Sequence, residues 1–191
     1  MTLRCATSNP GKLREFTRTA ERFGWQVEPV HGIPPCEEDG ATFLENARKK
    51  AQYYSSRVPG LVFAEDSGLE VTALGGAPGV YSARFAGEGA TDADNNRLLI
   101  ERLAGTGDRS ARYVAQIVLA DTGRIVGEFE GHVSGLIVDE PRGANGFGYD
   151  PHFFYEPFGC TFGEAPLERK MDVSHRTRAL EAMFESLNAR R

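Results

Sequence analysis

The chain has 191 residues, 40% hydrophobic and 26% charged, with a net charge of −5 at pH 7. This length can bury the core of one domain without disulfides, and three scattered cysteines that match no zinc-ligand spacing are interpreted as reduced thiols. The negative charge argues against a general nucleic-acid groove, and no apolar run approaches the roughly 18 residues of a membrane span. Without a signal-peptide pattern, the expected location is cytoplasmic.

A strand, a tight loop and a helix are predicted at the start of the chain. Leu3–Thr7 is short and partly apolar, and the loop Ser8–Gly11 follows it. Apolar residues then recur at helical spacing, at Leu13, Phe16, Ala20 and Phe23. The pattern therefore predicts a helix that begins directly after the loop.

An acidic loop leads into the second predicted helix. It follows a short predicted strand at Gln26–Val30 and contains two prolines and three acidic residues within residues 34–40. Thr42 and Glu45 then have the spacing of a capping box, which predicts a helix through about Ser56.

The rest of the chain alternates strand and helix patterns. Leu61–Ala64 is predicted to be a buried strand that ends at Glu65-Asp66-Ser67-Gly68. Thr91 and Asp94 are predicted to cap a helix with Leu98, Leu99 and Leu103 on its apolar side. Two strands, Arg112–Ala120 and Ile125–Val138, flank the turn at residues 121–123 and predict an antiparallel hairpin. A final helix from Ser174 has an apolar stripe of Ala179, Leu180, Met183, Phe184 and Leu187. The predicted fold class is α/β with a mixed, partly antiparallel sheet.

The loop Ser8-Asn9-Pro10-Gly11-Lys12 is a candidate phosphate site. Backbone N–H groups at a helix start carry partial positive charge and stabilise an oxyanion, to which Lys12 adds a full charge. The sequence is not a Walker A motif. The alternative is an ordinary turn with an exposed lysine.

Two acidic pairs are candidate ligands for a cation. They are Glu37-Glu38 in the acidic loop and Glu65-Asp66 after the third strand. Clustered carboxylates repel one another unless a cation intervenes, and Mg²⁺ takes one or two protein carboxylates with water and phosphates. The alternative for Glu37 and Glu38 is a solvated loop. Asp66 is the stronger candidate, because it follows a rigid apolar strand.

Aromatic and basic residues in the last third are candidates for holding a base. Flanking glycines leave the ring of Phe147 open to a planar partner in Gly146–Pro151. The alternative is that Phe147 and Tyr149 are core residues, which is the commoner fate of aromatic side chains. Lys170 and Arg176 add positive charge near the final helix start. The alternative is that Lys170 and Arg176 are surface cations and that His175 is a structural histidine.

Five motifs together resemble the inosine triphosphate pyrophosphatase family, also called XTP/dITP diphosphatases or HAM1-like proteins. They are TSNPGKLREF at Thr7–Phe16, TFLENARKKA at Thr42–Ala51, EDSGLEVTALGGAPGVYSARFAG at Glu65–Gly87, GFGYDPHFF at Gly146–Phe154 and ERKMDVSHRTRAL at Glu168–Leu180. The resemblance implies one domain over residues 1–191, with an elongated mixed sheet flanked by helices, two lobes, a central nucleotide cleft and usually a homodimer. It also implies Mg²⁺-dependent hydrolysis of ITP, dITP or XTP to the monophosphate and pyrophosphate.

The resemblance also implies roles for individual residues. The triphosphate would be cradled by Thr7, Ser8, Asn9, Pro10, Gly11 and Lys12. Asp66 would bind magnesium and accept a proton, Ser67 would contact substrate, and Lys50 would reach the phosphates. The base would be held and read by Phe147, Gly148, Tyr149, Asp150, Lys170, His175 and Arg176. Glu38 is the first choice for the second metal ligand and Glu37 the second.

Two other functions remain open on the sequence. One is a pyrophosphatase of the Maf-like group that acts on other modified or pyrimidine nucleotides, which the SHR and GFGYD segments argue against. The other is a nucleotide-binding regulator without turnover, which would not need an acid at position 66 beside a phosphate loop.

Overall fold

The computed structural model describes residues 1–190 and divides into two compact units. The first unit comprises Met1–Asp66, Ala115–Gly131 and the chain from His175 onward, and the second comprises Ser67–Val114 and His132–Ser174. The strands are β1 Thr2–Ala6, β2 Gln26–Pro29, β3 Leu61–Val71, β4 Ser110–Asp121, β5 Arg124–Ile137, β6 Phe153–Tyr155 and β7 Cys160–Thr161. The α-helices are α1 Pro10–Arg22, α2 Phe43–Ser55, α3 Asp92–Leu103, α4 Leu167–Met171 and α5 His175–Ala189.

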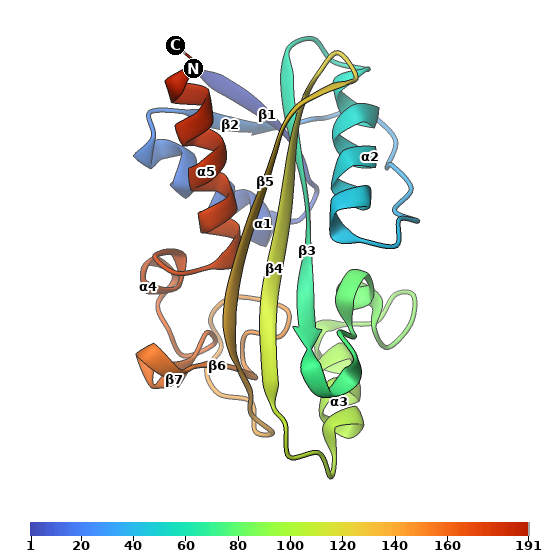
Figure 1. Cartoon of the computed structure of the whole chain (residues 1–191), viewed down its shortest axis with the longest axis vertical. Coiled ribbons are helices and arrows are strands. Elements are labelled where there is room, and N and C mark those ends of the chain that lie inside the picture. Colours follow the sequence, from blue (N-terminus) through green and yellow to red (C-terminus); the bar gives the residue numbers. More distant parts are fainter. Residues whose placement is uncertain (191) are drawn as a thin grey trace. The chain divides into compact units, whose positions relative to one another are not determined.

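The strands form one mixed sheet in the order β2-β1-β3-β4-β5-β6-β7 (Figure 1). Strand β1 pairs in parallel with β2 and β3, whereas β6 pairs antiparallel with β5 and β7. The predicted α/β class with a mixed sheet is therefore confirmed. No helix within residues 1–190 is long and apolar enough to cross a membrane.

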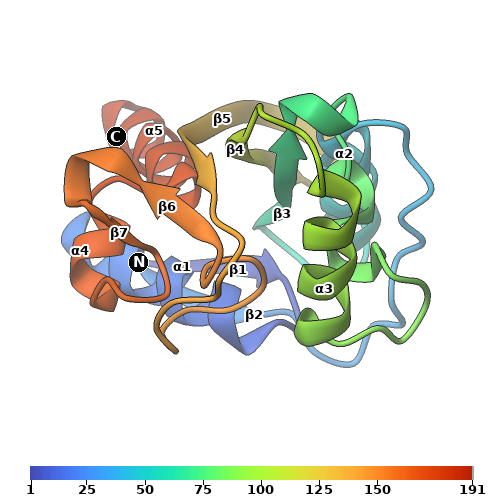
Figure 2. The same cartoon turned by 90° about the horizontal axis from the view of Figure 1, so that it is seen from below.

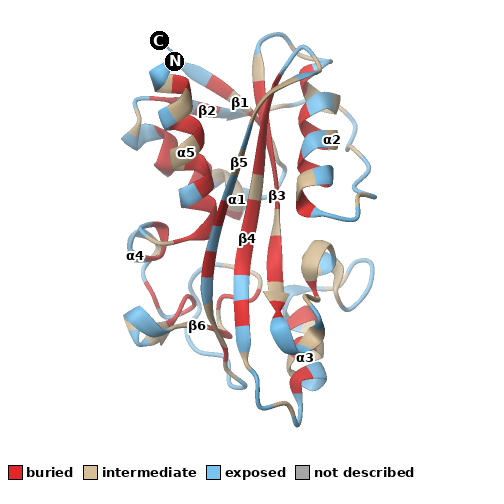
Figure 3. Cartoon of the chain, viewed as in Figure 1, coloured by how far each residue is buried: buried red, intermediate tan, exposed pale blue. Residues whose placement is uncertain are grey.

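In the first unit, helices cover both faces of the sheet (Figure 1). Phe63 of β3 belongs to the cluster formed with α1 and α5, whereas the next residue, Ala64, packs with Ala47 and Ala51 of α2. Successive side chains of a strand point to opposite faces, so the alternation assigns α1 and α5 to one face and α2 to the other. Figure 3 shows how buried residues concentrate on the central strands and along one side of α5.

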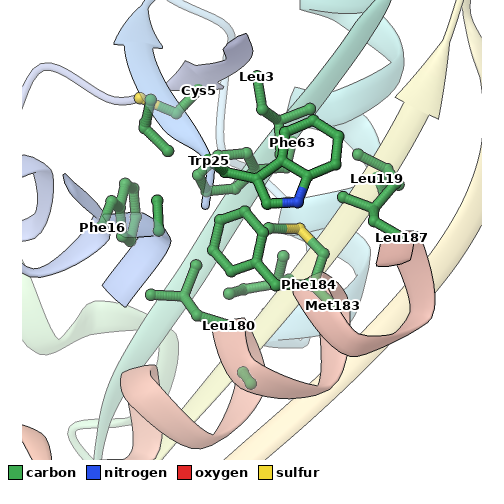
Figure 4. Close-up of a cluster of buried hydrophobic side chains, with 14 of the residues drawn as sticks. Leu3, Cys5, Phe16, Trp25, Phe63, Leu119, Leu180, Met183, Phe184 and Leu187 are labelled. Carbon is green, nitrogen blue, oxygen red and sulfur yellow. The ribbon is translucent and has the colours of Figure 1, made fainter. Parts of the chain in front are cut away.

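The larger core cluster lies between the sheet and the pair α1 and α5 (Figure 4). Phe16 and Ala20 of α1 are buried, with Leu13 and Phe23 packed against the cluster, as the helical spacing predicted. All five residues of the predicted stripe of α5 are buried as well. The two amphipathic helices therefore pack by the faces that the sequence indicated.

The third strand is longer than predicted. The prediction ended the strand at Ala64 and put Glu65 and Asp66 beyond its end, which is wrong, because β3 continues to Val71. Leu69 and Val71 are fully buried in the core of the second unit, and this burial favours the extended backbone past Gly68. Asp66 thus lies within a strand on a fixed backbone.

Local turn and cap predictions hold with one amendment. The hairpin of β4 and β5 closes on Thr122 and Gly123, both at positive φ (49° and 80°), as a two-residue hairpin turn of type I′ requires. Helix α3 has a complete capping box of Thr91 and Asp94. At α2 the box is only half formed, because Thr42 accepts from the Glu45 N–H while the Glu45 carboxylate accepts from the N–H of Ala41.

The second unit contains the elements that the sequence did not predict. Its core joins β3, β4, β5 and α3 to aromatic residues of the last third, including Tyr149, Phe153 and Phe162. The short elements β6, β7 and α4 were not predicted, since two to five residues carry too little periodicity. Figure 2 shows α3 and the long segment between β5 and β6 in this unit.

Candidate active site

The predicted phosphate loop caps helix α1. Asn9 is the N-cap, and its side-chain oxygen accepts from the N–H groups of Gly11 (2.8 Å) and Lys12 (3.1 Å). Pro10 occupies the first helical position, where no N–H is needed. The backbone donors assigned to an anion are thus already engaged by Asn9. The helix dipole, the exposed Ser8 and the ammonium of Lys12 remain as features that favour an anion.

Lys12 belongs to a buried ion network in the first unit. Its Nζ lies 2.9 Å from Glu65 Oε2. The other oxygen of Glu65 accepts from Arg176 Nε (2.9 Å), and Arg176 also donates to Glu15 of α1 (2.6 Å). Glu15, Glu65 and Arg176 are each at most 3% exposed. Arg176 is therefore held by two carboxylates of its own unit.

A second network surrounds Asp66 on the opposite face of β3. Lys50 Nζ lies 2.8 Å from Glu38 Oε2 and 3.3 Å from Asp66 Oδ1. Asn46 donates to the other Asp66 oxygen (3.1 Å), and its own side-chain oxygen accepts from the N–H of Gly40 (2.8 Å). A Cβ at Gly40 would lie 2.7 Å from that oxygen, so only glycine permits this approach of the acidic loop.

Burial and charge act against each other in both networks. Burial alone would raise the pKa of Glu65, but Arg176 and Lys12 outweigh it and hold that pKa well below its usual value. For Asp66 burial prevails over Lys50, and its pKa is raised. Burial would lower the pKa of Lys50, but Asp66 and Glu38 overcome it and raise the pKa, so the ammonium stays charged.

The donor set around Lys50 fits a hard cation. Mg²⁺ takes one or two protein carboxylates, and Asp66 and Glu38 already converge on one positive charge. Glu37, the second choice from the sequence, is instead directed to Lys49 (3.9 Å) with a largely exposed side chain. Residues 1–190 contain no cluster of three or more His, Cys, Asp or Glu placed to bind a metal ion. The remaining ligands would have to be water and phosphate oxygens.

In the second unit, Asp150 is the fixed centre of a separate group. Its Oδ2 accepts from Lys170 Nζ (2.6 Å) and from the N–H of Phe147 (3.0 Å), and Oδ1 accepts from the Tyr113 hydroxyl (3.2 Å). Asp150 and Lys170 are each 2% exposed. A Cβ at Gly146 would lie 2.0 Å from Asp150 Oδ2, and Gly146 also has a φ of 76°, so glycine is required there.

The two aromatic candidates have different environments. Tyr149 is buried in the core of the second unit, and its hydroxyl donates a hydrogen bond to Ser82 O (2.8 Å). Of the two alternatives for Tyr149, it is therefore a core residue. Phe147 is only partly buried, and the Lys170 ammonium lies 5.0 Å from its ring centroid. Beside it, α3 and residues 141–152 line a hollow of about 460 Å³. Phe147 is thus the aromatic residue that borders open space.

Comparison with known proteins decides the family. The model of the Ham1 family matches residues 3–186, almost the whole chain. The chain belongs to the Ham1 family.

Curated relatives and solved structures of this family agree with that assignment. The chain is 50% identical to a dITP/XTP pyrophosphatase of Syntrophobacter fumaroxidans, over 92% of this chain and 77% of that protein. It is 47% identical to a dITP/XTP pyrophosphatase of Thermus thermophilus, over 95% and 89% respectively. The Ham1 protein of Staphylococcus aureus is similar in structure, with a TM-score of 0.89 and 36% identity over all of both chains. A HAM1 protein from Coxiella burnetii has a TM-score of 0.91 and 36% identity over 99% of both chains.

Within this Ham1-family chain, the residues predicted from the sequence form two groups. Lys12, Lys50, Asp66, Glu38 and Arg176 belong to the first unit and are joined by the two ion networks. Phe147, Asp150 and Lys170 meet in the second unit. Ser67 follows Asp66 in β3, and the buried His175 begins α5.

Three further residues of these groups were not singled out by the sequence. They are Glu15, Asn46 and Tyr113. The spacing of Asn46 and Lys50 on a predicted helix was a usable signal, since residues four apart share a face. No local signal existed for the others, because Glu15 and Arg176 are 161 positions apart and Tyr113 and Asp150 are 37 apart.

Proposed function

We propose that this chain hydrolyses deaminated purine nucleoside triphosphates, dITP, XTP and ITP, to the monophosphate and pyrophosphate. The observation that carries the proposal is the convergence of Asp66 and Glu38 on one cation in the unit that also presents Lys12. The names of relatives 47–50% identical over more than nine tenths of this chain support the same activity.

The first unit is proposed to act on the phosphates. Asp66 and Glu38 would hold Mg²⁺, which when bound supplies positive charge against the polyphosphate. Asp66 would accept a proton from the water whose oxygen bonds to the α-phosphorus. Pyrophosphate would leave as the bond between the α-phosphorus and the oxygen that bridges it to the β-phosphorus breaks. Lys12 and Lys50 would stabilise the departing pyrophosphate by charge. No covalent enzyme intermediate is needed.

The second unit is proposed to bind the base. Phe147 borders open space and offers one aromatic face, and stacking contributes about 1–3 kcal/mol per base without choosing among bases. Selectivity would then come from hydrogen-bond donors whose bonds a 6-oxo group accepts, whereas a 6-amino group leaves those donors unpaired. Arg176 is held by Glu65 and Glu15, so we propose that its role is to fix the positions of these two carboxylates.

A panel of substrates tests the proposed activity. Pyrophosphate release would be measured for ITP, XTP, dITP, GTP, ATP and UTP, with and without Mg²⁺. Release from the first three that depends on Mg²⁺ is expected. A preference for UTP would favour a Maf-like activity, and no release from any nucleotide would favour a regulator without turnover.

The resemblance to this family also supports a homodimer. Light scattering coupled to gel filtration is expected to give twice the 20.9 kDa chain mass. A mass of one chain would contradict the proposed dimer without bearing on the activity.

A further inference from the structure

The Lys50 ammonium occupies the point at which the two proposed metal ligands converge. Its Nζ contacts Glu38 Oε2 at 2.8 Å and Asp66 Oδ1 at 3.3 Å, and the side chain is about nine-tenths buried. These are the same carboxylates that would coordinate Mg²⁺ under the proposed function. The protein therefore already contains a cation where the metal would be expected to bind.

An ammonium and a divalent cation that contact the same carboxylates repel each other. Like charges disfavour one another strongly in a partly buried site, where water screens them poorly. Lysine has a flexible four-carbon stem, which lets the ammonium leave without movement of helix α2. Metal binding would accordingly require the Lys50 ammonium to move away from Asp66 and Glu38.

The surroundings of Asp66 are arranged for such an exchange. Asn46 donates to Asp66 Oδ2 and is itself bound by the N–H of Gly40, and neither contact involves Lys50. The carboxylate of Asp66 thus keeps a partner when the ammonium departs. Glu38 lies in the acidic loop with 39% of its side chain exposed, so water can reach this side of the pair.

We propose that Lys50 is an internal competitor of the metal: in the nucleotide-free protein it neutralises Asp66 and Glu38, and the metal must displace it to bind. The inference rests on the proposed function, because it takes Asp66 and Glu38 as the metal ligands. Displacement frees the ammonium to meet the negative charge of a phosphate. One side chain then couples metal binding to phosphate binding, and such coupling is reciprocal.

The chain offers a matched control for this competition. Lys49 is the adjacent residue of α2, and its ammonium pairs with Asp39 and lies 3.9 Å from Glu37 of the same acidic loop. Lys49→Met removes the same charge from the adjacent position of α2 and leaves the contacts of Lys50 with Asp66 and Glu38 in place. The difference between Lys50→Met and Lys49→Met therefore isolates the competition from the general loss of positive charge.

The test is calorimetric titration of the nucleotide-free protein with Mn²⁺. Lys50→Met is expected to bind Mn²⁺ about tenfold more tightly than Lys49→Met, a typical size for coupling between two ligands. Lys50→Arg keeps a cation and is expected to bind no more tightly than the unaltered protein. Equal affinities of Lys50→Met and Lys49→Met, or weaker binding by Lys50→Met, would overturn the proposal.

A second measurement covers the case in which Lys50→Met fails to fold. Amine acetylation of the unaltered protein, read by mass spectrometry, is expected to rise at Lys50 when saturating Mn²⁺ is added and to stay constant at Lys49. Unchanged acetylation at Lys50 would overturn the proposal that the metal displaces this side chain. Asp66→Asn separates the two hypotheses: if it binds Mn²⁺ like the unaltered protein, the metal ligands of the proposed function are wrong.

Discussion

Two buried lysines, Lys50 in the first unit and Lys170 in the second, hold their carboxylate partners in different ways. In the first unit, Lys50 and Lys12 neutralise carboxylates that lie near the proposed metal and phosphates. The side chain of Lys12 is partly exposed, and so is that of Glu38, the partner of Lys50. In the second unit, Lys170 and Asp150 are both almost fully buried, and Asp150 has further donors in Tyr113 and the backbone of Phe147.

This difference corresponds to what each unit is proposed to bind. A metal and a polyphosphate bring charges of their own, so the first unit needs ions that can change partners. A base is flat and neutral, so the second unit needs a fixed shape beside Phe147. Removing an exchangeable ion should change stability little and activity greatly. Removing one partner of the fixed pair should do the reverse. Variants of single residues can break or sharpen this contrast.

The largest effect is expected on activity, from Asp66→Asn. Loss of the proposed metal ligand and proton acceptor should lower kcat/KM roughly 10⁴-fold, about 5.4 kcal/mol of transition-state stabilisation. Burial raises the pKa of Asp66 above its ordinary value of 3.8. At pH 7 the ionised carboxylate is therefore less favourable in the folded chain than in the unfolded chain. The neutral variant should therefore unfold at a temperature no lower than the unaltered protein at pH 7. Near-normal pyrophosphate release would refute the role of Asp66.

The second effect is on stability, from Lys170→Met in the second unit. Removing one partner of a buried pair leaves Asp150 uncompensated and typically costs about 3–5 kcal/mol. For a chain of this length, the thermal midpoint should fall by roughly 6–20 °C. Adding Asp150→Asn should recover part of the loss. A thermal midpoint unchanged by Lys170→Met would mean that the buried pair of Lys170 and Asp150 does not stabilise the second unit.

A smaller and pH-dependent effect is expected from Glu65→Gln. The carboxylate has a pKa held below its ordinary 4.5, so its contribution to stability is complete above that pH and is lost as the pH falls through the lowered pKa. Urea unfolding should find Glu65→Gln less stable by about 2–3 kcal/mol at pH 7. The free energies of unfolding of the variant and the unaltered protein should converge as the pH falls below 4.5. A difference that stays constant from pH 7 to pH 3 would argue against the ion network as its cause.

The smallest effect is expected from Phe147→Ala. Loss of a stacking face worth about 1–3 kcal/mol should raise KM for dITP by roughly 5- to 150-fold, with a much smaller change in kcat. Phe147→Tyr keeps the ring and serves as the control, and it should retain most of the affinity. If KM is unchanged by the alanine variant, the base binds elsewhere and the proposed division between units fails.

Sequence reasoning succeeded where the signal was local. The helix after Asn9, the hairpin at Thr122-Gly123 and the stripe of α5 follow from capping, turn chemistry and periodicity, which need only neighbouring residues. The family motifs likewise named the lysines and acids that the structure brings together.

It failed where distant parts of the chain supply the partner. The extent of β3 depends on the burial of Leu69 and Val71, which no pattern around Gly68 indicates. The neutralisation of Arg176 by Glu15 depends on the packing of α5 on α1, from opposite ends of the chain. The half-formed box at Thr42 shows the same limit on a smaller scale, since Ala41 competes for Glu45.

The alternation of β3 has a consequence for how the chain tolerates change. Glu65 points to the side of α1 and α5 and Asp66 to the side of α2, so two adjacent acids serve different neighbours. An insertion or deletion of one residue before them would exchange the two sides, and each acid would meet the other's cations at the wrong length. We therefore expect the strand from Leu61 to Asp66 to accept no change in length.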